Sequence, residues 1–159
     1  MAGSRKPGVT AIGSSTKREW PRRQGARSDG RYGLTGARGE ARSGFASVRE
    51  IGLPSYHSAR RQGADEDRAL LAAMVALLAV NKDTNLIARG GPEGAAFVRQ
   101  LAHGLLTDGP MTPDFVDRLE AMDDALTARN LSPGGTADLV GVTWFLAQVD
   151  AGSKGHRES

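Results

Sequence analysis

The sequence predicts an all-α fold, an antiparallel helical bundle that follows a disordered basic N-terminal tail. Three observations lead to this prediction. Between residues 65 and 149, four segments carry apolar residues at helical spacing, capping residues stand at their starts, and short connections join them. Short connections favour antiparallel neighbours. The chain has 159 residues and no cysteine, so it is long enough to build a hydrophobic core without disulfides.

Residues 1–30 form the predicted tail. They consist mainly of Gly, Ser, Arg and Lys without periodic apolar residues, a composition that cannot offset the entropy lost on ordering. Seven Lys or Arg and two acidic residues give this segment a net charge of +5, so the total of +3 leaves −2 for the other 129 residues. The basic character belongs to the tail. Nucleic-acid binding through the tail would rest on this charge alone, and we do not expect nucleic acid as a partner.

Residues 31–64 come next and mix glycines with apolar residues too irregularly for a long helix. We expect a structured loop here, or a loop with a short helix over 37–45. From residue 31 to about residue 150 the chain is predicted to form one helical domain.

The first two of the four helical segments differ in character. One opens at Asp65, a good N-cap, and is apolar on every face from residue 69 to residue 80, so it must be central. The other starts with Pro92 at its first position, directly after Gly90 and Gly91, and ends near Gly109.

The third and fourth segments also show clear starts. Thr112 and Pro113 are expected to begin a helix that carries Phe115, Leu119, Met122 and Leu126 on one stripe. A fourth helix is predicted from Ser132 and Pro133 to about residue 149, followed by a frayed C-terminal tail over 151–159.

The sequence also excludes several classes of protein. The longest apolar run is far shorter than the ~20 residues of a membrane span, and the N-terminus lacks the apolar core of a secretory signal. We therefore expect a cytoplasmic protein without a membrane partner. His57, His103 and His156 are far apart and lack the spacing of metal ligands.

One polar cluster is NLSPGGTADL, at the start of the fourth helix. Ser132 caps this helix, and Gly134 and Gly135 leave amides open to an anion, which makes a workable phosphate cradle. The alternative is a turn with a cap and no ligand. Asp138 lies one turn into an otherwise apolar helix, where it needs solvent, a partner or a cation.

A second cluster, DTNLIARGGPEG, brings an acid, an amide and an arginine together between two helices. It follows no strand and lacks the Gly-Lys-Ser/Thr ending, so it is neither a Rossmann fingerprint nor a P-loop. Asp83 and Glu93 can act in a ligand site, or they can be caps paired with Arg89. In a third cluster, YGLTGARGEA, Arg38 and Glu40 can bind a phosphate and a metal, or each other.

The order YGLTGARGEARSGF, DTNLIARGGPEG and NLSPGGTADLVGVTWFL closely resembles the triphosphoribosyl-dephospho-coenzyme A synthase family, in the branch serving malonate decarboxylase or citrate lyase. The resemblance covers residues 31–150. It implies an all-α transferase in which the ribose 2'-hydroxyl of 3'-dephospho-coenzyme A attacks the anomeric carbon of ATP, and adenine leaves. The product would be the precursor of a prosthetic group attached to an acyl carrier subunit.

Roles for the polar residues follow as a hypothesis from this resemblance. Carboxylates can stabilise oxocarbenium character or accept the hydroxyl proton, and Mg²⁺, expected with ATP, would join the triphosphate to carboxylates. The hypothesis assigns catalysis to Asp83, Glu93 and Asp138, metal binding to Glu40, Asp83 and Asp138, and substrate or phosphate binding to Arg38, Asn85, Arg89, Gly90, Gly91, Asn130, Ser132, Gly134 and Gly135.

The chain departs from the family before its first motif. A preceding helical half that active members are expected to carry is absent, and the chain reads Ser28-Asp29-Gly30-Arg31 where the family tends to have a histidine. Without that half, part of the nucleotide pocket should be lost and apolar stripes should face water, which favours a homo-oligomer. The alternative function is therefore an inactive truncated remnant, or a helical interaction protein of the same family.

Overall fold

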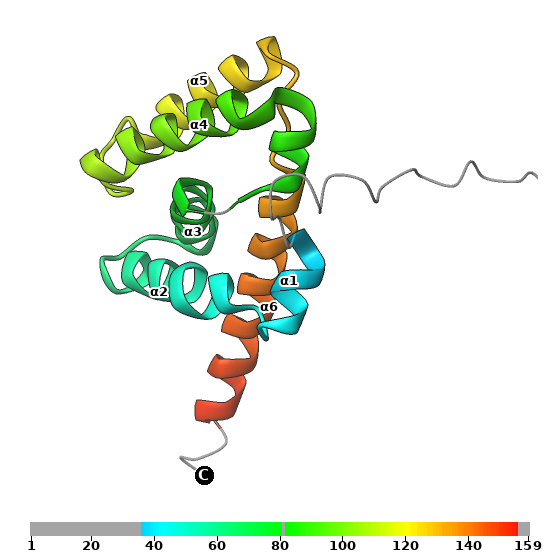
Figure 1. Cartoon of the computed structure of the whole chain (residues 1–159). Helices are drawn as coiled ribbons and strands as arrows, with labels where there is room; N and C mark the ends of the chain where they lie inside the picture. The colour runs from blue at the N-terminus through cyan, green and yellow to red at the C-terminus, as the bar shows by residue number, and fades with distance from the viewer. Residues whose placement is uncertain (1–35, 81, 156–159) are drawn as a thin grey trace, which may run out of the picture.

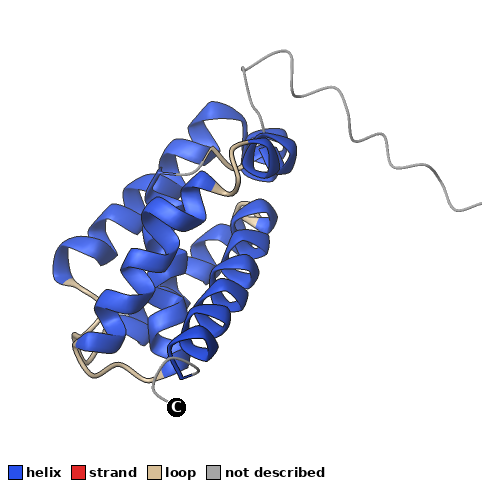
Figure 2. Ribbon diagram, turned by 90° about the horizontal axis from the view of Figure 1, so that it is seen from below, coloured by secondary structure: helices blue, strands red, loops and turns tan. Residues whose placement is uncertain are grey.

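The computed structural model describes residues 36–80 and 82–155, and all regular structure within them is helical (Figures 1 and 2). The all-α prediction is confirmed for this part, whereas the antiparallel order of the helices and the nature of the N-terminal tail stay predictions, the tail lying outside the described residues. The elements are α1 (Gly36–Arg42), the π-helix η1 (Val48–Gly52), α2 (Leu53–Arg61), α3 (Glu66–Val80), α4 (Thr84–Asp108), α5 (Phe115–Ala128) and α6 (Gly134–Gly155).

The central element is α3, as its apolar composition predicted. Its start is capped by Asp65, whose Oδ1 accepts a hydrogen bond from the amide of Arg68 at 2.8 Å. One side of α3 packs small residues such as Ala73 against α2 and α6. On another side Val75 and Leu78 join a cluster with α4 and α5. In Figure 1, α3 is seen nearly end-on between α2 and the pair formed by α4 and α5.

The segment before α3 is more helical than predicted. A short helix does form, over 36–42, but η1 and α2 then continue as helix from residue 48 to residue 61. Gly52 and Pro54 disfavour a helix by local propensity. Tertiary packing overrides it, because Val48 and Tyr56 are buried, and Pro54 lies in the first turn of α2, where its missing amide costs little.

The expected helix start at Pro92 is present as a kink within α4. Gly91 has φ 63° and ψ −170°, a conformation that favours glycine, and it separates a short segment beginning at Thr84 from the longer one that begins at Pro92. α4 ends at Asp108 before Gly109, as predicted. α5 begins at Phe115, three residues later than Thr112, because the hydroxyl of Thr112 donates to the carbonyl of Gly109 instead of capping the helix.

Among the described residues, none of the helices is by itself both long enough and apolar enough to span a membrane. The helices α3 and α4 satisfy those criteria only as a pair, with a bend of 56° between them.

Candidate functional site

The first and second polar clusters, NLSPGGTADL and DTNLIARGGPEG, meet at the N-terminal ends of α6 and α4. Asp83 is the N-cap of α4, and its Oδ1 accepts hydrogen bonds from the amides of Asn85 at 2.9 Å and Leu86 at 3.3 Å. This is the usual way in which an aspartate satisfies the free amides of a helix start. The cap predicted for Asp83 as one of two alternatives is therefore present.

The same carboxylate also holds the start of α6. Its Oδ2 accepts hydrogen bonds from the amide of Thr136 at 2.7 Å and from the Thr136 hydroxyl at 2.9 Å. Asp83 is only 3% exposed and Thr136 is completely buried. One buried carboxylate thus joins two helix N-termini through a contact between residues 53 positions apart in sequence.

The paired glycines of NLSPGGTADL are explained by this contact. A Cβ atom on Gly135 would lie 3.2 Å from both carboxylate oxygens of Asp83, and a Cβ atom on Gly134 would lie 2.9 Å from Nδ2 of Asn85. Both distances are shorter than ordinary contacts to a Cβ atom. The absence of side chains at these positions therefore allows the two clusters to approach each other, whether or not an anion also binds there.

Beyond Asp83 and Thr136, the two clusters stay in contact in antiparallel order, so that later residues of DTNLIARGGPEG meet earlier residues of NLSPGGTADL. A Cβ atom on Gly90 would lie 2.4 Å from Cδ2 of Leu131, and one on Gly94 would lie 3.0 Å from the same atom. Nη1 of Arg89 donates to Oδ1 of Asn130 at 3.4 Å. We refer to residues 83–94 and 130–136 together as the α4–α6 junction. It contains most of the residues that the sequence nominated for substrate binding.

The remaining nominated carboxylates of α4 and α6 face solvent. Glu93 and Asp138 are exposed, and neither forms a hydrogen bond or an ion pair with another residue in the described ranges. Arg89 bonds to Asn130, so the ion pair of Arg89 with Asp83 or Glu93 that the sequence offered as an alternative is not formed. Asn85, Arg89 and Asn130 are exposed as well, while Ser132 is half-buried. Free carboxylates and exposed amides border the junction.

Glu40, in the third cluster, has a local partner. Its Oε1 accepts a hydrogen bond from the Ser47 hydroxyl at 2.6 Å, and its Oε2 accepts one from the Ser47 amide at 3.3 Å, just before η1. The side chain of Arg38 lies outside the described residues. In the described part of the chain, no three His, Asp or Glu residues lie together so that they could hold a metal ion, and the Glu40, Asp83 and Asp138 set stays a prediction.

Comparison with known proteins decides the family. The family model described as ATP:dephospho-CoA triphosphoribosyl transferase matches residues 9–157. The chain belongs to this family. Its matched region begins at residue 9, inside the segment that the sequence assigned to the tail, and it includes the α4–α6 junction.

Curated members of the triphosphoribosyl transferase family are similar over most of this chain. The 2-(5''-triphosphoribosyl)-3'-dephosphocoenzyme-A synthase of Escherichia fergusonii is 48% identical over 122 residues, which are 76% of this chain and 40% of that protein. A probable synthase of the same name from Pectobacterium carotovorum is 53% identical over 123 residues, 76% of this chain and 39% of that protein. The chain thus spans about two fifths of these relatives. No solved structure gives a significant match.

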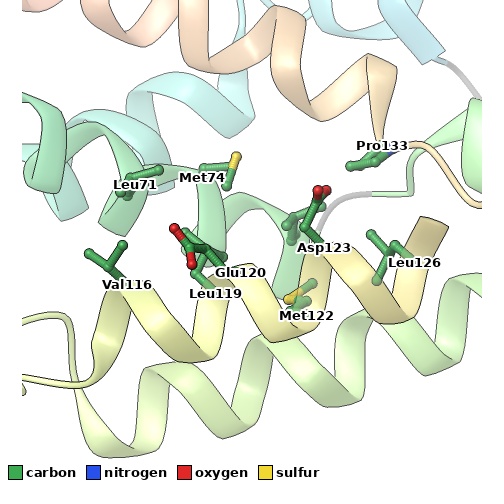
Figure 3. Close-up of a pocket in the computed structure, with 10 residues that line it drawn as sticks. Leu71, Met74, Val116, Leu119, Glu120, Met122, Asp123, Leu126 and Pro133 are labelled. Atoms are coloured by element: carbon green, nitrogen blue, oxygen red, sulfur yellow. The ribbon is translucent and has the colours of Figure 1, made fainter. Parts of the chain in front are cut away.

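The sequence did not predict a groove that lies beside the junction. It has a volume of about 360 Å³ and lies between α3 and α5, with Pro133 at the end near the start of α6 (Figure 3). The carboxylates of Glu120 and Asp123 stand at this otherwise apolar groove. The related signal in the sequence was the apolar character of α3 on every face, which does not by itself show which side the other helices cover. The remaining lining of the groove consists of Leu71, Met74, Leu78, Val116, Leu119, Met122 and Leu126.

Proposed function

We propose that this chain contributes part of the nucleotide site of a transferase that joins ATP to 3'-dephospho-coenzyme A and releases adenine. The proposal is supported by family membership and by curated relatives whose name is that of the synthase. The structural observation that carries it is the α4–α6 junction, which gathers two separate polar clusters of the sequence at one place. Because the chain spans about two fifths of these relatives, the complete site would need further residues.

The proposed reaction makes one bond and breaks one. The 2'-oxygen of the acceptor bonds to the anomeric carbon of the ATP ribose, the bond from that carbon to the adenine nitrogen breaks, and the triphosphate stays on the transferred sugar. The leaving nitrogen keeps the bonding electron pair and takes a proton, while the hydroxyl proton passes to a base. A carboxylate near the anomeric carbon stabilises the positive charge that develops on the sugar.

Within this reaction, Glu93 and Asp138 are the carboxylates suited to proton transfer or charge stabilisation, because both are exposed and free of partners among the described residues. Arg89, with Arg38, would bind phosphate oxygens, since a guanidinium offers donors that match them. The remaining nominated residues would position the substrates through amide and hydroxyl groups: Asn85, Gly90, Gly91, Asn130, Ser132, Gly134 and Gly135.

Magnesium, expected with ATP, fits only part of the predicted ligand set. Both oxygens of Asp83 already accept hydrogen bonds, and those of Glu40 bond to Ser47, whereas Asp138 is open to solvent. Protein-bound Mg²⁺ often uses one or two carboxylates and completes its shell with water and phosphate oxygens, so Asp138 and Glu93 are the residues that would hold it. When bound, the ion would neutralise charge on the triphosphate.

Adenine release tests the proposal. The purified full chain is incubated with ATP and Mg²⁺, with and without 3'-dephospho-coenzyme A, and adenine is measured chromatographically. Release that depends on the acceptor is expected. We expect Glu93→Gln and Asp138→Asn to lower the rate by about 100-fold or more at unchanged melting temperature. Asp124→Asn, an exposed acid on α5, is the matched control and should leave the rate unchanged.

The alternative is an inactive remnant or a helical interaction protein of this family. It is favoured by the open apolar groove. A ligand that binds the native state raises its melting temperature, so thermal protection by ATP separates the two functions. Protection with adenine release supports the transferase, and absence of both in a folded chain supports the remnant.

The wider setting is also part of the proposal. A product of this kind would be passed to an enzyme that modifies an acyl carrier subunit, in the cytoplasm. Self-association into a homo-oligomer would cover apolar surface such as Phe145, which is 59% exposed on α6.

A further inference from the structure

We infer that Asp83 is a positioning residue, which fixes the start of α4 against the start of α6, and that it is neither a metal ligand nor a proton acceptor. The part of this inference that concerns substrate rests on the proposed function. Its structural part stands on the hydrogen bonds, burial and glycine contacts of the α4–α6 junction.

The hydrogen bonds of Asp83 leave no acceptor position unused. An ionised carboxylate has about four acceptor positions, two on each oxygen. Oδ1 accepts from the amides of Asn85 and Leu86, and Oδ2 accepts from the amide and the hydroxyl of Thr136. A metal ion or a substrate proton could bind Asp83 only by displacing donors from one of the two helices.

Access to the carboxylate is closed as well. Asp83 is 3% exposed, and Gly135 lies so near that an added methyl group would be 3.2 Å from both carboxylate oxygens. Burying a charge is costly unless it is fully hydrogen-bonded, and here the positive ends of two helices share that charge. Asp83 therefore holds the starts of α4 and α6 together, whereas a carboxylate that binds substrate needs a side open to solvent.

The neighbours of Asp83 explain why its position matters for a ligand. Asn85 is exposed two residues after Asp83, and Asp138 is exposed two residues after Thr136. The bonds to Asp83 fix the distance between these two groups, which belong to different helices. An asparagine at position 83 would keep one oxygen but would turn an NH₂ group toward an N–H donor of one helix. The hydrogen bonds to that helix would then be lost.

Amide hydrogen exchange on the ¹⁵N-labelled full chain tests the structural part. In Asp83→Asn, we expect the amides of Asn85, Leu86 and Thr136 to exchange about tenfold faster, with no change at amides in the middle of α5. Glu40→Gln, which alters a carboxylate elsewhere, should leave those three amides as they were. Unchanged exchange at the three amides of Asp83→Asn would overturn the inference.

Magnesium dependence separates positioning from metal binding. ATP affinity is measured by calorimetry at several Mg²⁺ concentrations for the unmodified chain, Asp83→Asn and Gly135→Ala. A positioning role predicts about tenfold weaker ATP binding in both variants, with the Mg²⁺ midpoint unchanged, because both disturb the same contact. Val98→Ala, a destabilising change in the core of α4, should bind ATP normally.

Two results of that experiment have distinct meanings. A Mg²⁺ midpoint that shifts in Asp83→Asn but not in Gly135→Ala overturns the inference. Failure of the unmodified chain to bind ATP at any Mg²⁺ concentration refutes the proposed function, and the exchange measurement then decides the role of Asp83 by itself.

Discussion

The two sides of α3 differ in how closely the neighbouring helices approach. On one side, Gly52 of η1 meets Thr143 of α6 so closely that an added Cβ atom would lie 2.4 Å from its Oγ1 and 3.4 Å from Cδ1 of Leu77. On the other side, α5 stands across the groove of about 360 Å³ from Leu71 and Met74. Small residues therefore close the core toward α6, whereas nothing in the described residues fills the space toward α5.

The largest effect is expected where added volume has no room. Gly52→Val places its Cβ atom against the Thr143 hydroxyl and adds two methyl groups, so we expect the free energy of unfolding to fall by about 3 kcal/mol. Chemical denaturation measures the change. Gly104→Val is the matched control, since no atom lies near its Cβ position, and it should change stability by less than about 0.5 kcal/mol. Equal effects of the two changes would mean that helix propensity matters here and close packing does not.

A double-mutant cycle tests whether this destabilisation arises at the contact between Gly52 and Thr143. Gly52→Ala and Thr143→Ala should each destabilise the protein, the second because the Thr143 hydroxyl donates to the carbonyl of Leu139 at 2.8 Å. Together they should be less destabilising than their sum by about 1–2 kcal/mol, because Thr143→Ala removes the atoms that crowd the new methyl group. Additive free energies would show that the clash is relieved elsewhere.

The smallest effect is expected on the groove side of α3. Met74→Phe enlarges a partly buried side chain that lines the groove, and the groove can take the added atoms. The free energy of unfolding should change by no more than about 0.5 kcal/mol, in contrast to the loss of about 1–3 kcal/mol that overpacking causes in a filled core. The same denaturation experiment measures it, and a loss above that range would show that the groove is closed in solution.

Local signals were sufficient to predict several elements. Asp65 and the apolar run after it predicted α3, Gly91 with Pro92 predicted a helix start at the place where α4 is kinked, and Gly109 predicted the end of α4. These signals work because a cap, a positive φ angle and a missing amide act within one helical turn. η1 and α2 were missed because Gly52 and Pro54 disfavour helix locally, and only burial against α3 and α6 compensates.

The candidate site was predicted as separate clusters. Each of its polar residues could be named from the sequence, because acids, amides and glycines at helix ends are suited to bind phosphate or to cap. The sequence did not reveal that Asp83 bonds to Thr136, since a contact between residues 53 positions apart leaves no local pattern. The groove was also missed, because an apolar helix surface does not tell which side of it is covered.

By itself, the sequence determined that the chain is helical, where several helices start and stop, and that Gly134 and Gly135 leave the first amides of the last helix uncovered by side chains of their own. The tertiary structure decided which groups lie against these glycines. Gly134 and Gly135 are small because Asn85 and Asp83 occupy the adjoining space. The physical reason is that helix caps and glycine conformations depend on the nearest few residues, whereas close approach between two helices depends on how the whole core is packed.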